Sequence, residues 1–155
     1  MSGMTKHEHF EHHGQSLTEV ARSSLEQTGE KWTETRAVIF EALAGFTSPA
    51  SAYAIADIVS QARGKRVAPN SVYRILDLFV AKNLAVKVES ANAFLANRHP
   101  DCEHDCIFLI CDVCGEATHV DDDPVSQKVR DIAKGKGFGS IRPVIEVCGI
   151  CQKCN

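Results

Sequence analysis

The sequence predicts an α+β protein with a helical N-terminal part that ends in a β-hairpin, followed by a small α/β part. Three observations predict this division. Four stretches between residues 17 and 80 repeat apolar side chains at helical spacing. Residues 84–96 alternate as two short strands around a polar turn. All seven cysteines lie at or beyond Cys102, so the second part has a different chemistry.

The helices are expected at residues 17–27, 33–45, 51–62 and 70–80. Thr33 and Asn70 are the expected N-caps of the second and fourth helices, because their side-chain oxygens can accept from the first free backbone N–H groups. The fourth pattern is the clearest, since its apolar residues recur at i, i+3, i+4, i+7 and i+8. These residues are Val72, Ile75, Leu76, Phe79 and Val80.

The last two helices and the hairpin at residues 84–96 together predict a winged helix-turn-helix over residues 17–96. Residues 1–16 contain HEHFEHH and no helical apolar period, so we expect a flexible His-rich tail. Residues 97–104 are the predicted hinge to the second part.

Residues 105–155 are expected to form a helix packed against three strands. The strands are predicted at 107–110, 116–120 and 141–147, and the helix starts at Asp123-Pro124 and ends at Gly135 and Gly137. A unit this small needs a metal ion or a partner chain for stability.

Charge and hydropathy restrict the function. The net charge of the 155 residues is −3, and no apolar run approaches the ~20 residues that span a bilayer. The N-terminus has no apolar run of a signal peptide, so we expect a cytoplasmic protein with no membrane contact. Residues 61–87 nevertheless hold six basic residues against one acid, Asp77. This stretch is either a contact surface for an anion or a solvated helix face.

Two CxxC motifs, Cys111–Cys114 and Cys151–Cys154, predict a tetrahedral zinc site of four thiolates. A closed site of this kind is structural. The alternatives are four small buried apolar residues or a redox CxxC, and the pairing of two motifs disfavours both. A disulfide framework is disfavoured by the odd cysteine count and by the reducing cytoplasm.

A second zinc site is expected around the hinge, which gives two Zn²⁺ ions per chain. Its candidate ligands are His99, Cys102, His104, Cys106 and His119. Mixed thiolate and imidazole ligands favour zinc over ferrous iron or manganese. Metal bound between the two parts would bias the angle between them. The alternative is that Cys106 and Cys148 are buried apolar residues and His99 is a loop residue.

The stretches PNSVYRILDLFVAKNLAVKVESANAF, FLICDVCG and VIEVCGICQKC resemble the ferric uptake regulator family, and within it the zinc uptake regulators. The resemblance covers about residues 17–154. It implies a homodimeric, metal-dependent repressor with an N-terminal winged helix, a C-terminal α/β dimerisation domain and structural zinc at the paired cysteines. It also implies that Tyr53 and Arg74 approach DNA. Val86 and Asn97 depart from the pattern, because zinc uptake regulators often place a histidine and a cysteine at these positions.

The leading hypothesis is a zinc-responsive repressor of zinc-uptake genes that binds operator DNA as a homodimer. Arg74, with Asn70 and Ser71, lies on the polar face of a helix suited to the major groove, while Tyr73 is expected to pack against the domain. Phosphate contacts are expected from Arg63, Lys65, Arg66 and Lys82. The alternatives are a regulator of the same family that senses iron or peroxide, and a metallo-hydrolase or redox enzyme. An enzyme would need an open coordination position, so we expect no catalysis.

Overall fold

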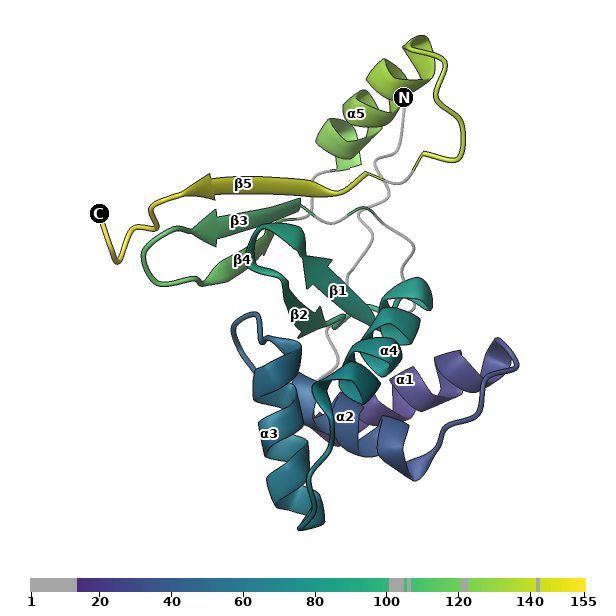
Figure 1. The fold of residues 1–155 in the computed structure, drawn as a ribbon. Helices are drawn as coiled ribbons and strands as arrows, with labels where there is room; N and C mark the ends of the chain where they lie inside the picture. The colour runs from purple at the N-terminus through teal and green to yellow at the C-terminus, as the bar shows by residue number, and fades with distance from the viewer. Residues whose placement is uncertain (1–13, 101–104, 106, 121–122, 142) are drawn as a thin grey trace.

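Four helices surround one apolar core in the N-terminal half of the chain (Figure 1). The structure is a computed structural model that describes residues 14–100, 105, 107–120, 123–141 and 143–155. The helices are α1 (Gly14–Gln27), α2 (Glu34–Ala44), α3 (Ala52–Arg63) and α4 (Pro69–Ala81). The first begins at Gly14, so three residues of the expected tail are helical.

Local chemistry fixes where these helices begin. The Thr33 hydroxyl accepts from the Arg36 backbone N–H at 3.3 Å, so its predicted role as N-cap is confirmed. The prediction that Asn70 caps α4 is wrong. That helix begins at Pro69, and Ala68 is the N-cap without a side-chain bond. Proline favours the first helical position because its φ is already helical and its missing N–H would have no partner there.

The orientation of α4 follows from what it buries. Val72, Leu76 and Phe79 are fully buried, and Phe79 packs edge-on against Phe40 with ring centroids 5.5 Å apart. The opposite face carries exposed polar residues, namely Asn70, Ser71, Arg74 and Asp77. The core therefore turns this polar face outward, away from the other helices.

The wing consists of β1 (Ala85–Val88) and β2 (Ala93–Ala96), which pair antiparallel around the short helix η1 (Glu89–Ala91). The wing is tied to the helices through Ala50 and Phe94, which exchange two backbone hydrogen bonds of 2.9 and 2.8 Å. These elements confirm the predicted winged helix-turn-helix.

The second part contains a three-stranded sheet in the order β4 (Ala117–Val120), β3 (Ile107–Cys111), β5 (Ile145–Gly149). The central strand β3 runs antiparallel to β4 and parallel to β5. The third strand was predicted at residues 141–147, and this placement is wrong: β5 begins four residues later and ends two residues later. Pro143 has no N–H for the ladder, which favours a start beyond it at Ile145.

The sequence predicted a helix packed against the three strands, and this packing is wrong. Helix α5 (Asp123–Gly135) projects away from the sheet (Figure 1). Arg130 holds it in place by donating two bonds to the Asp105 carboxylate, at 2.7 and 2.6 Å, and one to the Ile141 carbonyl at 2.9 Å. Its apolar residues Val125 and Ile132 are 45% and 60% exposed. Within the described part of the chain, no helix is both long and apolar enough to cross a membrane.

The wing packs directly on the sheet. Val88 of β1 is fully buried against Phe108 and Ile110 of β3. Glu146 of β5 adds a polar contact, because its carboxylate accepts from the backbone N–H groups of Glu89 and Ser90 at 2.6 and 3.1 Å. An apolar cluster and a charged cap therefore join the two parts at the wing.

This cap gives the stability a defined pH dependence. Burial acts to raise the pKa of Glu146, but hydrogen bonds from Ser90 and Glu89 outweigh it and lower that pKa below its ordinary value of 4.5. A lowered folded pKa contributes stability above the ordinary value, which is lost as the pH falls through the folded value. We expect Glu146→Gln to reduce the fall in melting temperature between about pH 5 and pH 3.

The measurement is thermal unfolding across this pH range, with Glu41→Gln as the control. Glu41 is an exposed acid on α2. Acid release of any bound metal affects all three proteins, so only the difference between them reports on Glu146. Identical slopes for the wild type and Glu146→Gln would contradict the prediction.

Candidate metal and DNA-binding sites

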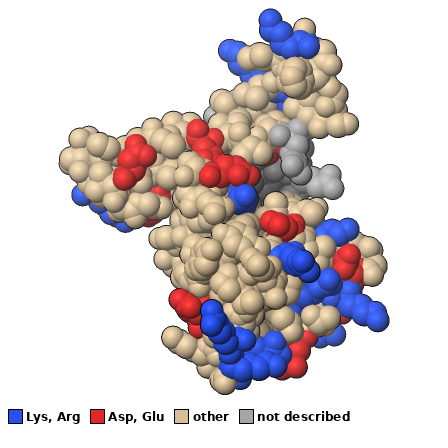
Figure 2. All heavy atoms as spheres, viewed as in Figure 1, with Lys and Arg blue, Asp and Glu red and all other residues tan. Residues whose placement is uncertain are grey.

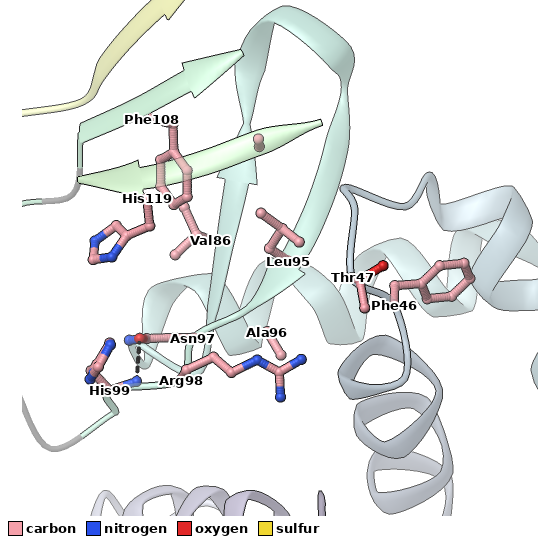
Figure 3. A pocket seen from close by; sticks show the side chains of 11 residues that line it. Phe46, Thr47, Val86, Leu95, Ala96, Asn97, Arg98, His99, Phe108 and His119 are labelled. Atoms are coloured by element: carbon pink, nitrogen blue, oxygen red, sulfur yellow. Dashed lines mark hydrogen bonds between the residues drawn. The ribbon is translucent and has the colours of Figure 1, made fainter. Parts of the chain in front are cut away.

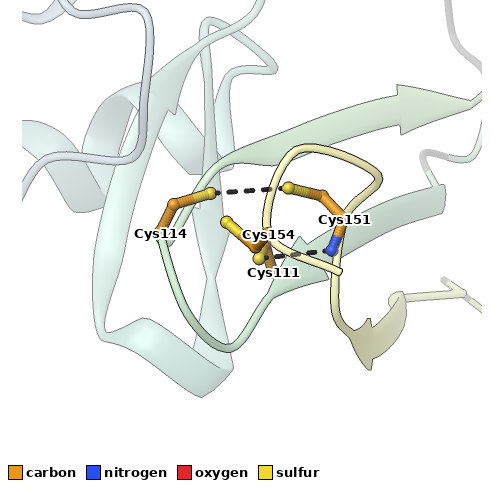
Figure 4. Close-up of side chains that lie close together, drawn as sticks. All are labelled: Cys111, Cys114, Cys151 and Cys154. Atoms are coloured by element: carbon orange, nitrogen blue, oxygen red, sulfur yellow. Dashed lines mark hydrogen bonds between the residues drawn. The ribbon is translucent and has the colours of Figure 1, made fainter.

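Four cysteine thiols converge at one end of the sheet (Figure 4). The sulfur atoms of Cys111, Cys114, Cys151 and Cys154 all lie within 4.8 Å of one another, and those of Cys114 and Cys151 are 3.8 Å apart. A tetrahedral zinc ion with bonds of ~2.3 Å to four sulfurs separates them by about 3.8 Å. The described residues include no other group of three or more potential metal ligands. The donor set and its spacing both fit zinc.

The parallel pairing of β3 and β5 brings the two motifs together. Cys111 lies opposite Gly149 at the end of the ladder, so both strands enter their CxxC turns at the same edge. The Asp112 backbone N–H donates to the Gly149 carbonyl at 2.8 Å and extends the strand pairing into the turn. The first turn closes at Gly115, whose φ of +73° is strained for any residue with a Cβ.

The electrostatics of the cluster favour a cation. Backbone N–H groups of Cys114, Cys151 and Val113 lower the pKa of the Cys111 thiol to about 6. The neighbouring Cys151 thiol, followed by burial, raises the pKa of Cys154 to about 12. The Cys111 thiolate therefore forms readily, while the raised pKa values of Cys114 and Cys154 oppose further ionisation, because negative charges crowd the site. A divalent ion removes that repulsion and lets all four act as ligands.

A second site candidate lies between the wing and the sheet. A pocket of about 350 Å³ is lined by Val86 of β1, by Asn97 and His99 after the wing, and by His119 of β4 (Figure 3). The His99 and His119 rings are 6.0 Å apart at their centroids. Two imidazoles on one tetrahedral zinc have centroids about 5 Å apart, so closing by about an ångström would let them share an ion. Val86 presents only an apolar side chain to this pocket.

The structure therefore brings together two of the five predicted hinge ligands, His99 and His119. The other three, Cys102, His104 and Cys106, lie outside the described residues. Asp105, which stands between two of them, is fixed by its ion pair with Arg130.

The predicted DNA-binding residues divide into an exposed group and one inward-turned arginine. Tyr53 is 62% exposed, and Lys65, Arg66 and Arg74 are exposed. Figure 2 shows Lys and Arg side chains gathered at the lower end of the molecule, where α3 ends. Arg63 instead donates to the Thr35 hydroxyl at 2.9 Å and pairs with Glu34 at 3.7 Å.

Tyr73 packs within the domain, as expected. Its ring lies 6.2 Å from that of Phe94, and its hydroxyl accepts from the Asn92 amide at 3.3 Å. The rings of Tyr53 and Tyr73 lie 6.3 Å apart in a T-shaped arrangement, so the exposed Tyr53 packs against the partly buried Tyr73. This contact fixes Tyr53 beside the polar face of α4.

A model of the ferric uptake regulator family matches residues 27–147. The chain belongs to the ferric uptake regulator family. No curated protein matches it. Among solved structures, a zinc uptake regulator complexed with zinc and DNA is 27% identical, covers 90% of this chain and 93% of its own, and has a TM-score of 0.82.

Two structures of XcZur allow a comparison of states. The holo form is 34% identical, covers 90% of this chain and 97% of its own, and has a TM-score of 0.78. The apo form is 35% identical, covers 90% and 95%, and has a TM-score of only 0.52. This family member is therefore arranged more like the holo form than the apo form.

Some residues that connect the two parts carry no signal in the sequence. Arg130 and Asp105 are 25 positions apart and Glu146 is 56 positions from Ser90, so no spacing pattern links them. Only the fold brings these residues together.

The exposed Lys65 and Arg66 and the inward-turned Arg63 should give different phenotypes when they are replaced. Lys65→Ala with Arg66→Ala should weaken DNA binding about equally for all sequences and lower the slope of log affinity against log salt by about 1 per lost phosphate contact. Arg63→Ala should instead lower the melting temperature, because it removes the contacts of α3 with Thr35 and Glu34 of α2. It should leave the salt slope of DNA binding unchanged. Anisotropy titrations at several salt concentrations, with thermal unfolding, separate these outcomes. A reduced salt slope for Arg63→Ala would show that it contacts phosphate.

Proposed function

We propose that this protein is a zinc-responsive transcriptional repressor of zinc-uptake genes that acts as a homodimer with two zinc ions per chain. The structural zinc would be held by the four paired cysteines. The sensing zinc would be held by His99 and His119, together with ligands from Cys102, His104 and Cys106. The four-thiolate site leaves no coordination position for a substrate, which supports a regulator rather than an enzyme.

The observation that carries the proposal is the arrangement of the two parts. The wing is packed on the sheet with the histidine pair at the joint, and this arrangement is more similar to holo XcZur and to the zinc- and DNA-bound regulator than to apo XcZur. A metal bound at the joint would stabilise the arrangement that contains it. Zinc would then raise operator affinity by favouring this state.

The surfaces outside the metal sites support a dimer on DNA. The apolar stripe of α5 is exposed at Val125, Val129 and Ile132, and Phe138 beyond it is 69% exposed. Large exposed apolar surfaces mark protein interfaces, and a second copy of the chain would cover this one. Two copies related by a two-fold axis would present their α4 helices to successive major grooves.

The decisive experiment is operator binding during titration of the metal-stripped sensing site with zinc, iron(II) and manganese(II). Zinc should drive binding at the lowest free concentration. Metal analysis should give four zinc ions per dimer, two of which mild chelation removes together with DNA affinity. His119→Ala should lose only the removable zinc. DNA binding driven by iron(II) alone would overturn the zinc assignment and favour an iron regulator.

A further inference from the structure

We infer that Asn97 is a positioning residue that couples His99, at the joint, to the C-terminal end of α4. Its side chain is 8% exposed and spans the space between the two segments. The amide Nδ2 donates to the Asn83 carbonyl at 2.7 Å. The Oδ1 atom accepts from the His99 backbone N–H at 2.9 Å, the dashed line in Figure 3. The Asn97 backbone N–H also donates to Leu84 at 2.9 Å.

The residues that Asn97 holds are the ones that end α4. Asn83 is in the left-handed conformation, with φ +62°. Its N–H donates to Val80 at 3.2 Å, and the Leu84 N–H donates to Phe79 at 2.8 Å. This pair of bonds is a Schellman motif, which fixes the direction of a chain leaving a helix. The Asn83 carbonyl is therefore held rigidly relative to α4.

Helix α4 in turn moves as a unit with its polar face. Its buried residues fix it in the core, and its 13 residues span about 20 Å, from the end that precedes Asn83 to the end that carries the exposed Asn70 and Ser71. A small shift at the C-terminal end therefore changes the position of the face that carries Arg74. Asn97 contacts this end on one side and the backbone of a candidate ligand on the other.

An amide is suited to this role because it donates and accepts at once. Both of its polar atoms are engaged with backbone groups, so Asn97 acts through position and does not coordinate the ion. A metal bound by His99 would restrain the His99 backbone, and the amide would pass this restraint to Asn83. Loss of the amide should leave zinc binding and the DNA affinity of the protein without sensing zinc unchanged. It should reduce the gain in DNA affinity that zinc produces.

This inference rests on the proposed function, and the test compares the wild type with Asn97→Asp and Asn97→Ser. The aspartate keeps the acceptor for His99 but cannot donate to Asn83. The serine is shorter and neutral, so Asn97→Ser provides the test if the buried carboxylate of Asn97→Asp prevents folding. Gln27→Glu, an amide-to-acid change at an exposed position of α1, is the matched control. Operator affinity is measured with zinc saturating and with the sensing zinc removed, alongside zinc stoichiometry.

Wild type and control should show a zinc-dependent gain in affinity within the usual allosteric range, about 5- to 150-fold. The Asn97 variants should keep both zinc ions but lose at least about fivefold of that gain. An unchanged gain overturns the inference. Loss of the second zinc also overturns it, because Asn97 would then build the site rather than transmit from it.

Hydrogen–deuterium exchange keeps the inference separate from the proposed function. Zinc should slow exchange in residues 79–84 of the wild type but not of Asn97→Ser. If zinc has no effect on DNA binding by the wild type, the proposed function fails, yet this exchange comparison still decides the coupling. Equal protection in both proteins refutes it.

Discussion

Replacement of Cys151 by serine should remove one zinc ion per chain and abolish both dimerisation and DNA binding. The β5 strand joins the sheet along one edge only, and its residue Val147 and the following Ile150 are 51% and 58% exposed. Few apolar contacts therefore hold this strand and the C-terminus in place. The Cys151 and Cys154 thiols would supply the missing constraint through the metal they share with β3.

Cys148→Ser is the matched control, because Cys148 lies on the same strand, is exposed and is outside the cluster. Metal analysis and analytical ultracentrifugation of both variants decide the result. Cys148→Ser should keep two zinc ions per chain and the wild-type mass. If Cys151→Ser remains dimeric and binds zinc in full, the four thiols do not hold the sheet together.

The sequence predicted elements whose partners are encoded locally. The apolar period of α4 identified the buried Val72, Leu76 and Phe79 and hence its polar face. The CxxC motifs identified the thiol cluster, because ligand type and spacing are fixed by the chemistry of zinc. In both cases, the pattern and the physical requirement lie within a few residues of each other.

Features that depend on contacts between distant residues were not predicted correctly from the sequence. The sequence predicted a helix from Asp123 packed against three strands, but the apolar stripe of α5 does not specify its partner, and the helix projects from the sheet instead of covering it. Arg63 belongs to a basic stretch, yet Thr35 and Glu34 on another helix turn it inward. Asn97 looked only like a missing ligand, because its role depends on the backbone of Asn83, 14 positions away.

Arg74→Ala should strongly weaken sequence-specific operator binding while leaving zinc content, oligomeric mass and melting temperature unchanged. Arg74 is exposed on α4, on the face that carries Asn70 and Ser71, and within the described residues its guanidinium forms no hydrogen bond or ion pair. A bidentate arginine–guanine contact contributes about 1–3 kcal/mol of discrimination, and the proposed homodimer would make it twice. Two such losses weaken the complex by about 30- to more than 10⁴-fold at fixed salt.

Arg74→Lys distinguishes base recognition from phosphate contact. Lysine keeps the charge but lacks the planar fork, so a residue that reads a base edge should lose specificity in both variants. A phosphate contact would be largely preserved by lysine and would appear only as a smaller salt slope in Arg74→Ala. Competition between operator and random DNA measures the difference. Equal loss on both DNAs would place Arg74 on the phosphate backbone and move sequence readout to its neighbours on α4.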